Sequence, residues 1–197
     1  LKRILPKDFI YSVARVSLNT KLIPLFKKLE RGVVLDVGAG NSPYRGLIPC
    51  KKYLSLDINK NHKPDIVSDV QKIEWESEYF DTVIATETLE HVRNPQKAIN
   101  EMHRILKPNG VCIVSVPFSY RYHPNPKDYY RFTWDSLKHL FRRFSKVEIY
   151  HHGSKFHVIW QMISESFFPL RVFNPIIGRI QVKTTSYPCG FIVFARK

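Results

Sequence analysis

The chain contains the run Val33-Val-Leu-Asp-Val-Gly-Ala-Gly40, and a second apolar run, Tyr53-Leu-Ser-Leu-Asp57, follows it. Glycines let a ligand approach the backbone closely and suit the positive φ angles of a turn from strand to helix. A carboxylate at the end of the second run can accept hydrogen bonds from both hydroxyls of a ribose. Asp57 lies 17 positions after Gly40 (57 − 40), near the offset of roughly 20 residues in a βαβ nucleotide-binding unit. Together the two runs predict a nucleoside-binding site.

Pro43 argues against a dinucleotide site. The fingerprint G-x-G-x-x-G requires glycine or alanine at position 43, so a pyrophosphate cradle and a nicotinamide oxidoreductase are disfavoured. What remains is D-x-G-x-G, with Asp36, Gly38 and Gly40. This pattern resembles the first motif of the class I S-adenosylmethionine-dependent methyltransferases, whose cofactor has a ribose but no phosphates.

Three later segments resemble further motifs of that family, in the expected order. They are Pro64-Asp-Ile-Val-Ser-Asp69-Val70, Phe80-Asp-Thr-Val-Ile-Ala-Thr-Glu-Thr-Leu-Glu-His91-Val92, and Leu106-Lys-Pro-Asn-Gly110-Val-Cys-Ile-Val-Ser-Val-Pro117. The resemblance covers residues 33–117 well and residues 118–197 less specifically. It implies an α/β fold, in which a Rossmann-like sheet of seven strands is flanked by helices and the last strand, Gly190-Phe-Ile-Val-Phe-Ala195, runs antiparallel.

The resemblance also implies a cofactor site. S-adenosylmethionine would be the cofactor and S-adenosylhomocysteine the product. In this family the acid at the end of the third strand, here Asp69, faces the adenine amino group, and the end of the fourth strand lies beneath the methionine arm. The expected cofactor-binding residues are Asp36, Gly38, Ala39, Gly40, Asp57, Ile58, Asp69, Val70, Thr86 and Glu87.

The loop after the fifth strand is dense in groups that bind and titrate. It reads H-x-x-P-x-D-Y-Y-R-F-T from His123 to Thr133, similar to a box in many bacterial and archaeal methyltransferases encoded near polysaccharide genes. His123 is the first candidate for accepting a proton from a hydroxyl, since an unperturbed histidine has a pKa of about 6.5. Asp128 and Arg131 either bind an anionic substrate or form a structural corner of the loop. His91 either takes part in catalysis or shapes the next helix.

Neither histidines nor cysteines predict a metal site. His151, His152 and His157 lie close together in the sequence, but strand alternation points the first two to opposite faces. Cys50, Cys112 and Cys189 are odd in number and widely spaced, which indicates reduced thiols and a cytoplasmic location. No run of about 18 apolar residues and no signal peptide is present, so neither a membrane span nor secretion is expected.

The 197 residues are expected to form a single domain. We divide it into an N-terminal helical cover (1–31), a cofactor-binding core (32–150), an insertion or lid (153–188) and the last strand (189–197). The cover is predicted as two amphipathic helices broken at Asn19-Thr20, and a short helix capped by Ser42 is predicted after the glycine turn. The insertion contains helically spaced apolar residues that would form a lid, a dimer contact or a surface resting on the inner face of a membrane. They are Ile159, Met162, Ile163 and Phe167.

The net charge of +14 indicates an anionic partner or a generally basic surface. The predicted function is methylation of a small molecule or a glycan, anionic or lipid-linked, most naturally at an oxygen. A nucleic-acid methyltransferase is the main alternative, although an N-P-P-Y motif is missing after the fourth strand. A non-catalytic protein that binds the cofactor and a partner is a third.

Overall fold

A computed structural model describes residues 12–183 and 186–197, and these residues form one seven-stranded sheet around which everything else is arranged. The strand order is β3-β2-β1-β4-β5-β7-β6, parallel from β3 to β5, with β7 antiparallel to both of its neighbours. This confirms the predicted α/β class and the antiparallel last strand. The strands are β1 (Gly32–Val37), β2 (Cys50–Asp57), β3 (Ile66–Val67), β4 (Phe80–Thr86), β5 (Leu106–Pro117), β6 (Lys146–His152) and β7 (Gly190–Arg196).

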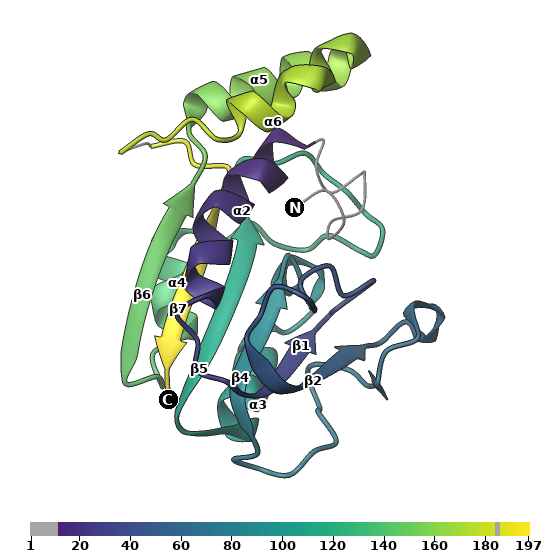
Figure 1. Ribbon diagram of the computed structural model, residues 1–197, viewed down its shortest axis with the longest axis vertical. Helices are drawn as coiled ribbons and strands as arrows, with labels where there is room; N and C mark the ends of the chain where they lie inside the picture. The colour runs from purple at the N-terminus through teal and green to yellow at the C-terminus, as the bar shows by residue number, and fades with distance from the viewer. Residues whose placement is uncertain (1–11, 184–185) are drawn as a thin grey trace.

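Helices cover both faces of the sheet and the end at which the parallel strands terminate (Figure 1). α2 (Val13–Phe26) crosses one face, while α3 (Pro95–Ile105) and α4 (Trp134–Leu140) pack on the other. α5 (Lys155–Ser166) and α6 (Asn174–Ile177) lie beyond the carboxyl ends of the strands and contact α2. The 3-10 helices are η1 (Lys60–His62), η2 (Leu89–His91) and η3 (Phe168–Phe173).

The alternation of side chains along the strands divides the core into two layers. Val34, Ile84 and Ile113 pack on the face covered by α2, whereas the neighbouring Leu35 and Val83 pack on the face covered by α3 and α4. Strands apolar on both faces are typical of a buried parallel sheet. The core therefore holds the carboxyl ends of β1, β4 and β5 rigidly side by side.

α2 corrects the prediction of two N-terminal helices. It runs without a break through Asn19-Thr20, and Ser12 rather than Thr20 caps it. Asn19 accepts a hydrogen bond of 2.9 Å from the buried Tyr44 hydroxyl, and the Thr20 hydroxyl donates to the carbonyl of Ser17. Both polar side chains thus find partners without interrupting the helix, so they do not act as a break. Residues 1–11 of the predicted helical cover lie outside the described residues.

No helix follows the glycine turn, so the prediction of a short helix capped by Ser42 is wrong. Residues 41–48 form a series of turns, and Ser42 itself has a φ of +50°. Ser42 therefore cannot start a right-handed helix as a cap in the β region would. Gly46 and Pro49 follow within seven residues and prevent a helix from forming later. α2 covers this face of the sheet in its place, with Tyr44 buried beneath it.

The helices on the other face begin at residues whose side chains cap them. The Asn94 side chain accepts a hydrogen bond from the amide of Lys97 at the start of α3, and Thr133 accepts one from Ser136 at the start of α4. α3 ends at Ile105, before Pro108. Correct caps and apolar spacing place these helices against the sheet, leaving the loop between β5 and α4 free to form the site.

The packing of α2 can be tested at Leu22, which is fully buried against the sheet. Leu22→Ala is expected to lower the free energy of unfolding by about 2–5 kcal/mol, because it removes buried methyl groups and leaves a cavity. Lys28→Ala, at an exposed position beyond the helix, should change it by less than about 0.5 kcal/mol. Urea unfolding measures both. Equal stability of the two variants would contradict the assigned role of α2 in the core.

Candidate active site

The turn after β1 brings backbone groups to the end of the sheet. Gly38 and Gly40 have φ angles of +63° and +51°, which L side chains rarely adopt. A Cβ at Gly38 would lie 2.3 Å from a methyl group of Thr88, whereas a Cβ at Gly40 would meet nothing within 4 Å. Gly38 is thus needed for packing. Gly40 instead faces open space that a ligand can fill.

Asp57 fixes this turn to the neighbouring strand. Its Oδ2 accepts a 2.8 Å hydrogen bond from the amide of Gly40, and its Oδ1 accepts one of 2.8 Å from Asn59. His62 Nδ1 lies 3.3 Å from Oδ2. Each carboxylate oxygen has a further lone pair, so Asp57 can still accept hydrogen bonds from ribose hydroxyls.

Asp36 lies beneath the turn as a buried acid. The Tyr53 hydroxyl donates a short hydrogen bond to its Oδ2, while Oδ1 has no hydrogen-bond partner in the described residues. Burial raises the pKa of Asp36 to about 7, even though the Tyr53 hydrogen bond opposes the shift. Asp36 therefore keeps its proton to a higher pH than an exposed aspartic acid does.

A cavity of about 450 Å³ opens beside the glycine turn, within the range of small-molecule sites. Five predicted cofactor residues line it, and they come from the ends of β1 and β4. They are Gly38, Ala39, Gly40, Thr86 and Glu87. Its other wall comes from α2 and the loop after β5, with Arg15, Leu18, Tyr120 and His123.

The other five predicted cofactor residues do not line this cavity. Asp36 is beneath the turn, Val70 is buried in the core, and Ile58 is 70% exposed at the end of β2. Asp57 and Asp69 are tied to backbone amides, the latter to Gln71. The structure thus separates a cavity at the end of β1 and β4 from an open surface at the ends of β2 and β3.

Sequence reasoning missed the part of the wall that α2 supplies. Arg15 donates to the Tyr44 hydroxyl at 3.4 Å and lines the cavity together with Leu18. His152, at the end of β6, also reaches the cavity, and burial lowers its pKa to about 3. The apolar spacing of α2 indicated a buried face, but spacing alone does not show that the helix crosses the ends of strands that follow it in the chain.

These features fit S-adenosylmethionine. The turn offers backbone amides without side chains, and the Gly40 position is open. The Glu87 carboxylate at the wall is held by a 2.9 Å hydrogen bond from the Ser115 hydroxyl, and Glu87 itself has a φ of +52°. A fixed negative charge beside the cavity suits a cofactor that carries a sulfonium and an ammonium group.

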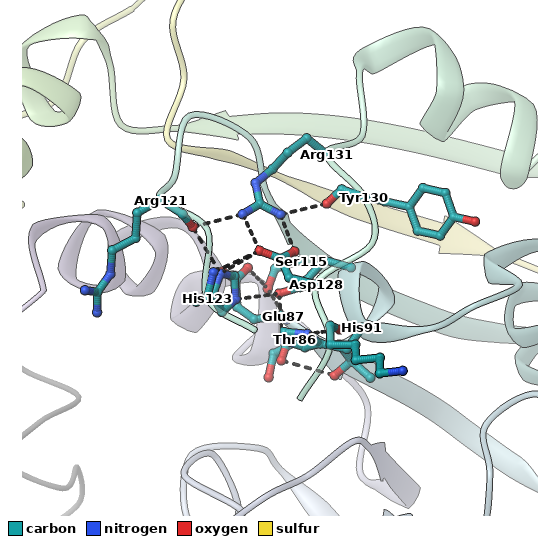
Figure 2. A network of polar contacts seen from close by, with 12 residues as sticks. Thr86, Glu87, His91, Ser115, Arg121, His123, Asp128, Tyr130 and Arg131 are labelled. Carbon is teal, nitrogen blue, oxygen red and sulfur yellow. Dashed lines mark hydrogen bonds and ion pairs between the residues drawn. The ribbon is translucent and has the colours of Figure 1, made fainter. Parts of the chain in front are cut away.

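Asp128 and Arg131 hold the loop after β5 in shape (Figure 2). Arg131 forms a two-pronged ion pair with Asp128, including a 2.7 Å contact to Oδ2, and also donates to the carbonyls of Arg121 and Tyr130. The Asp128 side chain is 1% exposed, and hydrogen bonding from Arg131 lowers its pKa to about 2. These contacts match the alternative of a structural corner, since they occupy both side chains within the protein.

The same corner positions His123. Its amide donates to Asp128 Oδ2 at 3.1 Å, and its Nδ1 lies 3.1 Å from that oxygen and 3.2 Å from the carbonyl of Arg121. The ring of His91 is close by, with 5.0 Å between the ring centroids, and its Nδ1 faces the carbonyl of Lys127 at 3.0 Å. Two histidines that are 32 positions apart in the sequence are therefore neighbours, and His123 lines the cavity.

The buried carboxyl of Glu90 lies beneath both histidines. Its Oε1 is 3.7 Å from His91 Nε2 and 3.9 Å from His123 Nε2, and the side chain is fully buried. Neither oxygen has a hydrogen-bond partner within the described part of the chain. Burial, reinforced by the charge of Glu87, raises the pKa of Glu90 well above its usual value, and burial lowers the pKa of His91.

Comparisons with known proteins agree with this fold. Residues 35–114 match a family described as "Methyltransferase domain". A tRNA (carboxymethyluridine(34)-5-O)-methyltransferase of Arabidopsis thaliana is 28% identical over 118 residues, which cover 54% of this chain and 29% of that protein. The matched stretches span less than half the length of the curated relatives.

Solved structures share the whole fold. A S-adenosylmethionine-dependent methyltransferase from Archaeoglobus fulgidus has a TM-score of 0.63 at 18% identity, covering 92% of each chain. A phosphoethanolamine N-methyltransferase 2 from Haemonchus contortus, in complex with phosphomonomethylethanolamine and S-adenosylhomocysteine, has a TM-score of 0.60 at 15% identity, covering 90% of this chain and 51% of that one.

Residues 35–114 thus carry a methyltransferase-domain match, and the chain has the fold of S-adenosylmethionine-dependent methyltransferases. The family match and the shared fold agree with the predicted family, and the S-adenosylhomocysteine-bound neighbour agrees with the predicted cofactor. None of the helices in residues 12–183 and 186–197 is long and apolar enough to cross a membrane.

The Asp57 contact predicts a loss of cofactor binding. Asp57→Ala is expected to weaken S-adenosylhomocysteine binding by about tenfold or more, since loss of a charged hydrogen-bond partner costs about 1.5–3 kcal/mol. Isothermal titration calorimetry measures the affinity. The exposed Asp135→Ala serves as the matched control and should bind as the wild type does. Unchanged affinity in Asp57→Ala would remove Asp57 from the site.

Asp36 predicts a pH-dependent stability. The pKa of Asp36 is about 7 in the folded protein and about 4 in the unfolded chain, so between these values the folded state binds the proton more tightly. The free energy of unfolding therefore falls as the pH rises from about 4 through about 7. Asp36→Asn cannot ionise and should not show this loss. The stability of the variant relative to the wild type, from urea unfolding, should therefore be higher at pH 8 than at pH 5. A difference that is equal at both pH values would contradict the raised pKa.

Proposed function

We propose that the chain transfers a methyl group to an oxygen atom of a small molecule or a glycan, including a glycan linked to a lipid. The observation that carries the proposal is the position of His123. Its side chain lines the cofactor cavity at the carboxyl ends of β4 and β5, and the Asp128 and Arg121 contacts fix its orientation. A hydroxyl acceptor benefits from a proton acceptor at this position, because general bases accelerate such transfers by about 10²–10⁴-fold.

A second cavity supports a sizeable acceptor. It has a volume of about 680 Å³ and adjoins the cofactor cavity, since Ser12 and Tyr120 line both. Its wall combines apolar groups such as Phe168 with the guanidinium groups of Arg121 and Arg171. An anionic acceptor with an apolar portion matches this lining.

The segment 153–188 would act as a lid over that acceptor. α5 and η3 supply most of the second cavity's wall, and many of their apolar side chains face outward. The most exposed are Met162, Phe167, Phe168, Val172 and Ile176, each more than 60% exposed. Exposed apolar patches of this kind mark contacts with a partner, so they would meet a lipid-linked acceptor, a membrane surface or a second copy of the chain.

In the proposed mechanism the protein supplies alignment and removes water. S-adenosylmethionine supplies a methyl group already activated on a sulfonium. Gly38 and Gly40 would let it approach the backbone, Asp57 would bind the ribose hydroxyls, and Glu87 would face the ammonium group. His123 Nε2 would take the proton of the attacking hydroxyl. Asp128 and Arg131 would position His123 and would not touch the acceptor.

A nucleic-acid acceptor is the second candidate. The net charge of +14 favours contact with phosphates, and the Arabidopsis relative is by name a tRNA methyltransferase. A gel shift with total tRNA discriminates the two proposals. Binding that falls steeply between 50 and 200 mM salt, together with methylation of the tRNA, would favour this candidate.

The role of His123 predicts a selective loss of turnover. His123→Ala should lower the rate of methyl transfer by about 10²–10⁴-fold while changing S-adenosylhomocysteine affinity less than about threefold, since a general base acts on the transfer step. His139→Ala, an exposed histidine in α4, is the matched control. The measurement follows radiolabelled methyl groups into acidic oligosaccharides, a lipid extract and total tRNA.

The pool that receives the radiolabel distinguishes the three candidate functions. Label in oligosaccharide or lipid, lost in His123→Ala, supports the proposal. Label in tRNA alone transfers the assignment to the nucleic-acid candidate. Tight cofactor binding with no label in any pool would favour a non-catalytic protein that binds the cofactor and a partner.

A further inference from the structure

Three metal-ligating side chains converge beside the cofactor cavity. Glu90 and His91 come from η2, and His123 comes from the loop after β5. One ligand atom from each lies within 4.8 Å of the other two. The pairs His91 Nε2–Glu90 Oε1 and His123 Nε2–Glu90 Oε1 are 3.7 and 3.9 Å apart, so neither pair is a hydrogen bond. The three groups surround a gap that none of them closes.

The contacts of the two imidazoles show which nitrogen faces this gap. His91 Nδ1 lies 3.0 Å from the carbonyl of Lys127, which can only accept, so Nδ1 carries the hydrogen. His123 Nδ1 lies between the carbonyl of Arg121 and the carboxylate of Asp128, and the same reasoning applies. In the neutral rings both Nε2 atoms therefore present lone pairs towards Glu90. A second-shell acceptor on Nδ1 is the usual arrangement for a histidine that binds a metal through Nε2.

The environment of the Glu90 carboxyl indicates that these three side chains bind a ligand. Its side chain is 0% exposed, and both of its oxygens lack a hydrogen-bond partner among the described residues. A buried, unpartnered carboxyl is costly. A single proton on Glu90 can serve only one Nε2 and leaves the other lone pair unsatisfied. A cation in the gap satisfies all three groups at once.

We propose that Glu90, His91 and His123 bind a divalent transition-metal ion, with Zn²⁺ as the first choice. Two imidazoles and one carboxylate form a ligand set that suits zinc and leaves a coordination position open. Ligand atoms of a tetrahedral zinc site lie about 3.4 Å apart, given bonds of about 2.0–2.1 Å. The observed separations of 3.7 and 3.9 Å exceed that value by about 0.3 and 0.5 Å, and all three ligand atoms lie within 4.8 Å of one another. The proposed zinc site differs from what the sequence patterns predicted, which was no metal site.

The ion would bind at the wall of the cofactor cavity, because His123 lines that cavity. The role of the ion described next rests on the proposed function. An acceptor hydroxyl that takes the open coordination position would be oriented by the ion, and its pKa would fall. With the ion bound, His123 would be a ligand and could not accept the proton. The ion would instead lower the pKa of the hydroxyl, so that its proton passes to solvent water before methyl transfer.

The test is a titration of the chelator-treated protein with Zn²⁺ by calorimetry, and with Co²⁺ by visible absorption. It is made without cofactor or acceptor. We expect one ion per chain and a tetrahedral Co²⁺ spectrum. His91→Ala and His123→Ala should each weaken binding by about a hundredfold or more, since loss of an outer-shell partner alone costs about 10- to 100-fold. Glu90→Gln keeps the shape of the side chain and should also lose binding.

His139→Ala and His151→Ala, two histidines outside the cluster, are the controls and should bind as the wild type does. Circular dichroism confirms that each variant is folded. Wild-type protein that binds neither ion, or binds both no more tightly than folded Glu90→Gln does, would overturn the site. Such a result leaves the proposed methyl transfer untouched, since that depends on the radiolabel assay. Zinc binding without any methyl transfer would instead keep the site and reject the proposed function.

Discussion

The contact between the Asp57 carboxylate and the amide of Gly40 is the constraint on which the site depends. It joins the turn after β1 to the end of β2, 17 residues further along the chain. The turn can reach Asp57 because Gly38 and Gly40 adopt positive φ angles, and Gly38 has no Cβ to collide with Thr88. Backbone amides and an acid are thereby held at one end of the parallel sheet, where open α/β folds bind their ligands.

The absence of a helix in residues 38–49 changes how this end of the sheet is enclosed. Positive φ at Ser42, followed by Gly46 and Pro49, leaves only turns in that segment. α2 covers the exposed face instead and brings Arg15 and Leu18 to the cavity wall. An N-terminal element thus becomes part of the site, and the Asn19–Tyr44 hydrogen bond connects it to the turns that it covers.

Sequence patterns predicted the succession of strands along the chain and the glycine turn, because these depend on local preferences and on alternation. The predicted helix break at Asn19-Thr20 was wrong, because the tertiary fold brings the Tyr44 hydroxyl close to Asn19 and gives its side chain a partner. Sequence patterns also could not reveal the group formed by Glu90, His91 and His123. His123 returns to η2 from 32 positions away, held there by the ion pair between Asp128 and Arg131. Local spacing carries no information about such a return.

The most direct test of the account is a calorimetric titration of the purified protein with S-adenosylhomocysteine, with NAD as a parallel ligand. The glycine turn without a pyrophosphate cradle predicts micromolar binding of S-adenosylhomocysteine, one per chain, and no heat with NAD. Binding of NAD, or no binding of either ligand by folded protein, would contradict the assignment of the cavity to this cofactor.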